Sequence, residues 1–136
     1  MRLSKKFTTP YMEELIKFET AQKAKDKGLT GIKWNSGKSY MSNGDIFKHE
    51  IVEISDPKKY THYPFAITQS VLAKWLREEH NIDVFLDSVG GRSGYYYVLQ
   101  YVDSGNQIKT GDTYHIFEEA YEKGLFEALN LLEDVD

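Results

Sequence analysis

The stretch ITQSVLAKWLREEHNI (67–82), with the strands and the closing helix that follow it, decides the fold. Its apolar residues recur at helical spacing, and its last residues run into a strand pattern. Three strand candidates come next, namely IDVFLDS, GYYYVLQYV and QIKTGDTYH. FEEAYEKGLFEALNLL (117–132) then closes the chain as an amphipathic helix. The order α-β-β-β-α predicts the α+β class, with one antiparallel sheet and two helices.

Both ends of the first of these helices are marked in the sequence. Thr68 is a favourable N-cap residue, and Asn81 is expected to end the helix. Lys74 and Arg77 are expected on the polar side, while His80 is interpreted as a cap residue that the helix dipole stabilises. The predicted apolar stripe consists of Val71, Leu72, Trp75 and Leu76.

The closing helix carries a glycine inside its apolar stripe. Gly124 costs about 1 kcal/mol of helix propensity relative to alanine, so we expect a close helix–sheet approach at this position. The broad apolar face consists of Ile116, Phe117, Ala120, Tyr121, Gly124, Leu125, Ala128, Leu131 and Leu132. The opposite, solvated face is predicted to carry Glu118, Glu119, Glu122 and Glu133.

The N-terminal third begins with a second helix signal. Thr9 is an N-cap candidate, and Pro10 suits the first helical position. Apolar residues at helical spacing follow, and Gly28 is a good C-cap. The pattern predicts a helix over about 10–27.

The region between these helices is predicted to form a hairpin or a three-strand unit. Residues 30–34 (TGIKW) and 45–54 (DIFKHEIVEI) resemble strands, and the NSGK and SNGD sequences between them are turn signals. Residues 55–64 are interpreted as a connector. We expect a single domain in which 1–60 form an N-terminal part and 67–133 form the α-β-β-β-α unit.

The central strand predicts a sheet with two apolar faces. Alternation places Tyr95, Tyr97, Leu99 and Tyr101 on one face, and Tyr96, Val98, Gln100 and Val102 on the other. Two helices in this order normally cover one face only. We expect the N-terminal part to cover the second face, with a second subunit or a ligand as the alternatives.

Composition and charge exclude several classes of protein. The 136 residues include no cysteine, which excludes disulfides, thiolate zinc sites and cysteine nucleophiles. The net charge is −4, but 1–33 carry eight basic and four acidic residues, whereas 67–136 carry five basic and thirteen acidic residues. The acidic C-terminal half argues against a nucleic-acid groove there. Without a secretory signal or an apolar run of ~18 residues, we expect a cytoplasmic protein that does not enter a membrane.

Catalytic, metal and cofactor motifs are not found in the sequence. The four histidines, His49, His62, His80 and His115, do not show the HExxH or HxH spacing of metal sites. Neighbouring glutamates on a helix point about 100° apart, so they do not form an acid/base pair by themselves. We expect a non-enzymatic protein without metal or cofactor. A hydrolase would need an acid/base pair assembled from distant segments.

The glycine-rich connection VGGRSG (89–94) supports one ligand hypothesis. A backbone nest with Arg92 as its charge partner would bind a phosphate, and tyrosine rings beside it would stack on a base. Turn statistics favour the alternative, a plain hairpin turn. The candidate ligand-binding residues are Arg92, Tyr95 and Tyr97, with Lys74 and Arg77 as further phosphate contacts and Trp34 and Tyr40 as weaker aromatic candidates.

Over 67–133, the α-β-β-β-α order resembles the double-stranded-RNA-binding domain in topology only. That family holds phosphates with a basic cluster at the start of its last helix. The corresponding stretch here, HIFEEAYE (115–122), is acidic. Because phosphate contacts dominate nucleic-acid affinity, we do not expect binding to double-stranded RNA.

Three stretches are similar to a family of small proteins encoded by bacteriophages and mobile elements of gut bacteria. They are KFETAQKAKDKGL (17–29), TQSVLAKWLREEHNIDV (68–84) and FEEAYEKGLFEALNLL (117–132). The resemblance implies a non-enzymatic phage accessory protein, and does not assign catalytic residues. Such a protein would act in counter-defence, by sequestering a nucleotide signal or by blocking a host defence protein. The alternative is a structural protein of a phage or mobile element that self-assembles into a homo-oligomer.

Overall fold

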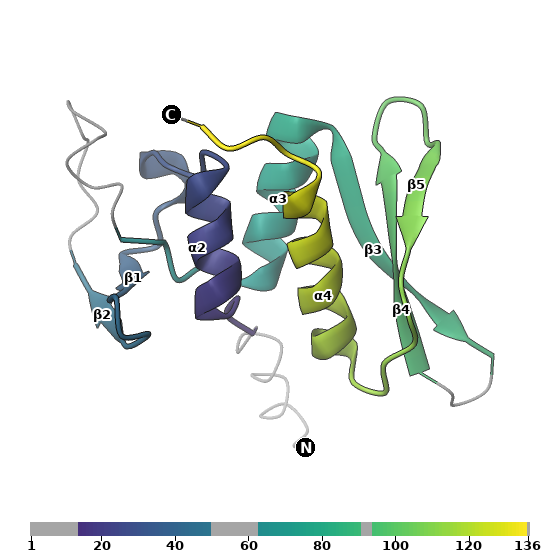
Figure 1. Ribbon diagram of the computed structural model, residues 1–136, viewed down its shortest axis with the longest axis horizontal. Coiled ribbons are helices and arrows are strands. Elements are labelled where there is room, and N and C mark those ends of the chain that lie inside the picture. The colour runs from purple at the N-terminus through teal and green to yellow at the C-terminus, as the bar shows by residue number, and fades with distance from the viewer. Residues whose placement is uncertain (1–13, 50–62, 91–93, 136) are drawn as a thin grey trace, which may run out of the picture.

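A computed structural model describes residues 14–49, 63–90 and 94–135 of the chain (Figure 1). Within these residues, three helices and two antiparallel sheets confirm the α+β prediction. The C-terminal unit has the predicted order, α3-β3-β4-β5-α4. The elements are α2 (Phe18–Asp26), a 3₁₀ helix (Ile32–Trp34), β1 (Lys38–Tyr40), β2 (Ile46–Lys48), α3 (Gln69–His80), β3 (Ile82–Val89), β4 (Gly94–Tyr101), β5 (Gln107–Thr110) and α4 (Phe117–Asn130).

Helices α3 and α4 form the middle layer of the molecule (Figure 1). The sheet β3-β4-β5 packs on one side of them, and α2 packs against α4 from the other side. The hairpin β1-β2 lies beyond α2 in the same view. None of the helices in the described part of the chain is long and apolar enough to span a membrane.

The predicted signals at both ends of α3 are confirmed. The Thr68 side chain accepts a hydrogen bond from the Val71 backbone N–H at 3.3 Å, as an N-cap residue does. Asn81 ends the helix in the left-handed conformation, with φ 60°. Leu72, Trp75 and Leu76 are buried, whereas Lys74 and Arg77 are exposed, as the stripe predicts.

His80, the last residue of α3, packs its ring edge-on against Trp75, with 4.5 Å between the ring centroids. Burial lowers the pKa of His80 below its ordinary value of 6.5, and this outweighs the nearby Glu79 carboxylate, which favours the protonated form. His80, interpreted as a cap residue that the helix dipole stabilises, lies in the last turn of α3, and its ring packs on the indole of Trp75. The lowered pKa favours the neutral form of the ring.

We expect stability to fall as His80 is protonated. Between pH 7 and pH 5 the unfolded chain takes up a proton more readily than the folded chain, so acidification favours unfolding. His80→Gln should flatten the dependence of the free energy of unfolding on pH, measured by urea denaturation. The exposed His115 provides the control, His115→Gln, which should keep the wild-type slope. Equal slopes in the wild-type protein and His80→Gln would contradict this role.

The helices cover the face of the sheet that carries Tyr97 and Leu99. The strands pair antiparallel, with Val84 opposite Leu99 and Leu86 opposite Tyr97. Leu99 is fully buried and Tyr97 is 3% exposed. The outer face carries Asp83, Phe85 and Asp87 of β3 and Tyr96, Val98 and Gln100 of β4.

The expectation that the N-terminal part covers the outer face is wrong for the residues that the structure describes. Figure 1 shows α2 and the β1-β2 hairpin on the opposite side of α3 and α4 from the sheet. The physical reason is that α4 has two apolar sides: one faces β3 and β4, and the other faces α2. The described residues of the N-terminal part therefore pack on the helices and do not cover the outer face of the sheet.

The close approach predicted at Gly124 is confirmed. A Cβ atom built on Gly124 would lie 2.7 Å from the Tyr97 Cβ and 3.1 Å from a Val84 methyl group. Real side chains avoid contacts this short. The glycine therefore sets the distance between α4 and the sheet.

The predicted N-terminal helix starts later than expected. Residues 14–17 precede α2 and are not helical, and 10–13 lie outside the described residues. The Ile16 backbone N–H donates to the Ile67 carbonyl at 2.9 Å, which holds this segment extended beside the start of α3. The end of the helix is predicted correctly, because Gly28 follows it at φ 104°.

Between α2 and α3, the predicted hairpin is present but its first strand is misplaced. Residues 32–34, expected in a strand, form the 3₁₀ helix, and β1 lies further along, between the two predicted turn signals and overlapping the first of them at Lys38. β1 pairs antiparallel with β2, the first part of the predicted strand 45–54. The remainder of that strand from residue 50, and the connector up to residue 62, lie outside the described residues.

Candidate functional site

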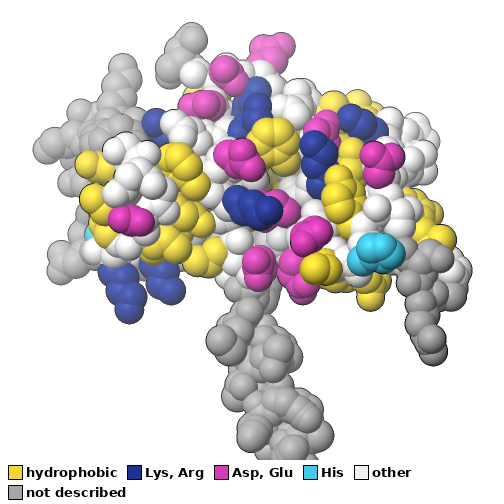
Figure 2. All heavy atoms as spheres, turned by 60° about the horizontal axis from the view of Figure 1, so that its bottom comes forward, with side chains coloured by type: hydrophobic (Ala, Val, Ile, Leu, Met, Phe, Trp, Pro, Cys, Tyr) yellow, Lys and Arg dark blue, Asp and Glu magenta, His cyan; other side chains and the backbone are white. Residues whose placement is uncertain are grey.

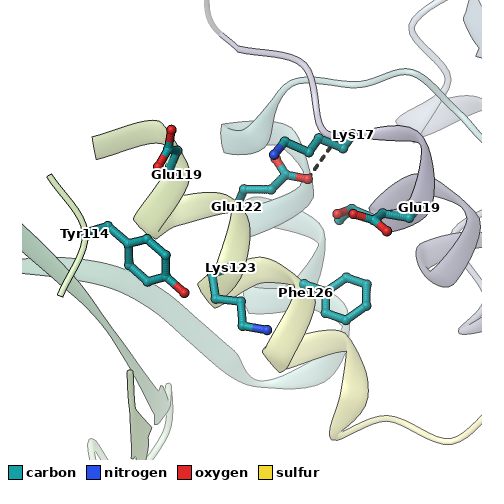
Figure 3. Close-up of a pocket in the computed structure, with 8 residues that line it drawn as sticks. Lys17, Glu19, Tyr114, Glu119, Glu122, Lys123 and Phe126 are labelled. Atoms are coloured by element: carbon teal, nitrogen blue, oxygen red, sulfur yellow. Dashed lines mark hydrogen bonds between the residues drawn. The ribbon is translucent and has the colours of Figure 1, made fainter. Parts of the chain in front are cut away.

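A cleft of about 380 Å³ lies between α2 and α4 (Figure 3). Its lining combines carboxylates and ammonium groups with two aromatic rings. The lining residues are Lys17, Glu19, Thr20, Tyr114, Glu119, Glu122, Lys123 and Phe126. Two of them, Thr20 and Glu122, are buried and belong to the packed interface between the helices.

Glu122 is a buried carboxylate on α4, with 7% of its surface exposed. One carboxylate oxygen accepts a hydrogen bond from the Lys17 backbone N–H at 2.8 Å (Figure 3). The other accepts from the Gln69 side-chain amide at 3.0 Å. Lys17 is the N-cap residue of α2, which has no side-chain cap of its own. A carboxylate from α4 therefore caps the N-terminus of α2, where the helix dipole favours a negative charge.

The same junction ties three distant segments together. The Gln69 amide also donates to the Glu118 carbonyl at 2.9 Å, and the Gln69 backbone N–H donates to the Glu14 carbonyl at 2.9 Å. The Tyr40 hydroxyl donates to the Ile16 carbonyl. Burial raises the pKa of Tyr40, and the nearby carboxylates of Glu122 and Glu14 raise it further. The hydroxyl thus stays protonated and serves as a donor.

The open part of the cleft is rimmed by charges of both signs. Lys123 forms an ion pair with Glu127 one turn along α4, with 3.1 Å between the Nζ and Oε2 atoms. Lys109 of β5 pairs with the same carboxylate at 2.9 Å. Hydrogen bonds from both lysines lower the pKa of Glu127, with Lys109 contributing more than Lys123. The ammonium group of Lys123 is therefore already paired with a carboxylate of its own helix.

An aromatic surface adjoins the cleft at the start of α4. We use this name for Tyr95, Ile116, Phe117 and Tyr121. The ring of Phe117 meets Tyr95 at 5.4 Å and Tyr121 at 5.8 Å between centroids, both edge to face. Ile116 is 50% exposed and Phe117 is 44% exposed. Tyr95 also exchanges two 2.7 Å backbone hydrogen bonds with Tyr114, which lines the cleft, so the two features are joined.

One face of the molecule mixes charged and hydrophobic groups. Figure 2 shows basic and acidic side chains gathered near its centre, with hydrophobic side chains to both sides of them. Such an arrangement is typical of a surface that binds a partner through apolar contacts and selects that partner by its charge. It differs from the continuous basic surface that a nucleic-acid site requires.

The structure places the predicted ligand residues in separate environments. Arg92 lies outside the described residues. Tyr97, Trp34 and Tyr40 are buried core residues, so their rings are occupied by packing. Tyr95 alone among the predicted aromatic residues joins an exposed aromatic cluster.

The two predicted cations of α3 also lie away from the cleft lining. Lys74 reaches Glu78 in the next turn at 3.8 Å, and Arg77 is exposed on the same helix. Lys33 donates to the same Glu78 carboxylate at 3.1 Å, which lowers the pKa of Glu78. None of the six predicted ligand residues that the structure describes lines this cleft.

Sequence reasoning missed Glu122 because it was grouped with the solvated glutamates of α4. That prediction is wrong, since Glu122 is buried. A signal was present in the spacing. Leu125 and Leu129 follow Glu122 at i+3 and i+7, so the three share one side of the helix, and both leucines are fully buried.

Neither a metal centre nor a known family is assigned to the described part of the chain. Among the described residues, no group of three or more histidine, aspartate or glutamate side chains is placed to hold a metal ion. Comparison of the chain with protein-family models, curated proteins and solved structures finds no match. The assignment of function therefore rests on this chain's own residues.

Proposed function

We propose that the protein is a non-enzymatic binding protein that recognises a partner protein through the aromatic surface and the cleft beside it. The exposed rings and side chains at the start of α4 carry this proposal. Large apolar side chains clustered on a surface mark interaction sites, and aromatic residues are enriched at the centres of protein interfaces. Glu118 and Glu119 stand exposed beside Phe117 and supply an acidic rim.

Two features favour binding of a protein over catalysis or nucleotide capture. The buried carboxylate of Glu122 uses both oxygens to hold α2 and α3, which opposes a role as a general base. The cleft lining has three carboxylates against two ammonium groups, and Lys123 is already paired. The phosphates of a nucleotide would meet net repulsion there.

The biological setting of the proposal comes from the resemblance to phage and mobile-element proteins. In that setting the protein acts in the cytoplasm of the host cell as an accessory protein. Its partner would be a host protein, and blocking a defence protein is the form of counter-defence that a protein-binding surface supports. Sequestration of a nucleotide signal remains the competing form.

The aromatic surface can be tested by affinity capture from a lysate of the host bacterium. Phe117→Glu places a charge at the centre of the surface and should abolish recovery of a specific host protein. Leu131→Glu is the matched control, because Leu131 is 45% exposed at the other end of α4. The control should retain the partner. Recovery of the same proteins by wild type and Phe117→Glu would contradict the proposal.

Two further measurements separate the competing functions. Calorimetry against a panel of signalling nucleotides should give no heat, and strong binding would support the sequestration form instead. Light scattering should show a monomer. An oligomer that Phe117→Glu dissociates would favour the structural, self-assembling alternative.

A further inference from the structure

The cleft between α2 and α4 has three carboxylates that no cation neutralises within the described residues. They belong to Glu19, Glu119 and Glu122. Neither Glu19 nor Glu119 takes part in an ion pair there. The carboxylate of Glu122 accepts hydrogen bonds from a backbone N–H and a side-chain amide, which are neutral donors. The cleft therefore carries negative charge that its own contacts leave in place.

The lysines around the cleft do not balance these carboxylates. Lys123 pairs with Glu127, which lies outside the lining, at 3.1 Å between the Nζ and Oε2 atoms. Lys23 does not line the cleft, and its ammonium group lies over the Phe126 ring at 4.9 Å from the centroid. Among the described residues, this leaves the ammonium group of Lys17 as the one unpaired cation in the lining. A cation that enters the cleft is therefore attracted, because three carboxylates outweigh a single ammonium group.

A buried hydroxyl group at the cleft also lacks a partner. Thr20 lines the cleft from α2 and is 1% exposed. Within the described residues, no hydrogen bond of the Thr20 side chain is found. Buried polar side chains are generally hydrogen-bonded, so an unpaired hydroxyl beside a cleft indicates that a ligand supplies the partner. Figure 3 shows Tyr114 on the other side, with its hydroxyl projecting toward the same space.

These groups match a guanidinium better than an ammonium group. A guanidinium is planar, carries five N–H donors in a fixed geometry and stacks on aromatic rings. The cleft offers carboxylate and hydroxyl oxygens as acceptors from both helices and from the segment before α4. Lys23 and Lys123 already contact the ring of Phe126, so the ring of Tyr114 is the aromatic wall of the lining that remains for stacking.

We propose that the cleft receives an arginine side chain of the partner protein. The carboxylates of Glu19 and Glu119 would pair with its guanidinium, and the hydroxyls of Thr20 and Tyr114 would accept further hydrogen bonds. A volume of about 380 Å³ is at the small end of the range for ligand sites, which suits one side chain. The proposal rests on the proposed binding function and names the chemical group by which the partner is recognised.

The cleft and the aromatic surface are placed to bind one partner together. Tyr114 and Tyr95 exchange two backbone hydrogen bonds of 2.7 Å, and the ring of Tyr95 packs on Phe117. An arginine in the cleft would thus lie close to the apolar contact at Phe117. Arginine and aromatic residues are enriched among those that contribute most to the affinity of protein interfaces.

The test compares two tripeptides that differ in one charge. One is acetyl-Ala-Arg-Ala-amide, and the other carries citrulline, whose urea group is neutral and of similar shape, in place of arginine. Each peptide is titrated into the isotope-labelled full chain and followed by NMR. The arginine peptide should bind at least about fivefold more tightly, since it alone forms ion pairs with the carboxylates. It should also shift the backbone amide signals of Thr20 and Tyr114.

Charge variants test the sign of the site. The double variant Glu19→Gln/Glu119→Gln removes both unpaired carboxylates and should abolish the preference for the arginine peptide. Glu133→Gln, at an exposed position beyond the end of α4, is the matched control and should keep that preference. Lys17→Met removes the opposing charge, leaves the backbone N–H that bonds Glu122, and should strengthen arginine binding. Equal binding of both peptides by the wild-type chain, or weaker arginine binding by Lys17→Met, would overturn the proposal.

Thr20→Val tests the buried hydroxyl, because valine has nearly the same shape. Replacing an unpaired buried hydroxyl by a methyl group does not cost stability, so the midpoint of urea denaturation should not fall. Arginine binding should weaken, since one acceptor is lost. A variant that is less stable and binds the arginine peptide as the wild type does would show that the hydroxyl serves the fold, and would overturn the site as proposed.

The proposed function and the arginine site can fail separately. If Phe117→Glu loses the host protein but Glu19→Gln/Glu119→Gln captures it as the wild type does, the arginine site is refuted and the proposed function is intact. If the arginine peptide is preferred while Phe117→Glu captures the same host proteins as the wild type, the cleft is supported and the aromatic surface is refuted. Free arginine that binds more tightly than the tripeptide would assign the guanidinium to a small molecule and overturn the partner-protein anchor.

Discussion

Glu122→Ala is expected to lower the free energy of unfolding by about 3 kcal/mol, because hydrogen bonds to charged groups contribute about 1.5–3 kcal/mol each and their partners would be left unpaired. The Lys17 backbone N–H and one bond of the Gln69 amide would lose their acceptor. The N-terminus of α2 would also lose the negative charge that caps it from α4. Urea denaturation followed by circular dichroism measures the change.

The matched control for this substitution is Glu119→Ala. Glu119 lies on the same helix and the same cleft but is exposed, so its removal should change the free energy of unfolding by less than about 0.5 kcal/mol. Glu122→Gln should fall between the two, because an amide oxygen accepts one of the two hydrogen bonds. Equal effects of Glu122→Ala and Glu119→Ala would show that the buried carboxylate does not hold the junction.

Gly124→Leu should destabilise the protein by about 3 kcal/mol or more, at the upper end of typical overpacking costs. Even the first carbon of the new side chain would lie 2.7 Å from the Tyr97 Cβ. The helix would have to move away from β3 and β4, and the packing around Leu99 and Leu125 would loosen. The midpoint of thermal unfolding and the near-ultraviolet circular dichroism of the buried tyrosine should both change.

A graded series separates this steric effect from helix propensity. Gly124→Ala should destabilise less than leucine, because it gains about 1 kcal/mol of helix propensity against a smaller clash. Asn130→Leu adds the same side chain at the exposed last position of α4 and should remain within about 0.5 kcal/mol of the wild type. A stabilised Gly124→Ala variant would mean that the helix can shift at little cost.

The C-terminal unit could be predicted from the sequence because its signals are local. Thr68 and Asn81 mark the ends of α3 by their own cap geometry, within five residues of the groups that they bond. The alternation along β4 and the stripe of α4 are similarly short-range. The N-terminal part was predicted less well, since residues 14–17 are held extended by pairing with 67–69 rather than by their own helical preference.

The candidate site could not be predicted because its residues come together only through tertiary packing. Glu122 and Lys17 bond across 105 positions of sequence, and neither residue type signals burial. Tyr97 was predicted to contact a ligand because it lies close in sequence to Arg92 and its ring could stack on a base. Only the docking of α4 decides that its ring is covered, and Gly124 makes that docking close.

The cap that Glu122 provides for α2 also affects when α2 can reach its native packing during synthesis of the chain. Glu122 lies 105 positions after Lys17, so during synthesis α2 is made well before the carboxylate that caps it. The N-terminal part therefore cannot reach its final packing until α4 has been made. Contacts of this length slow folding and make it cooperative.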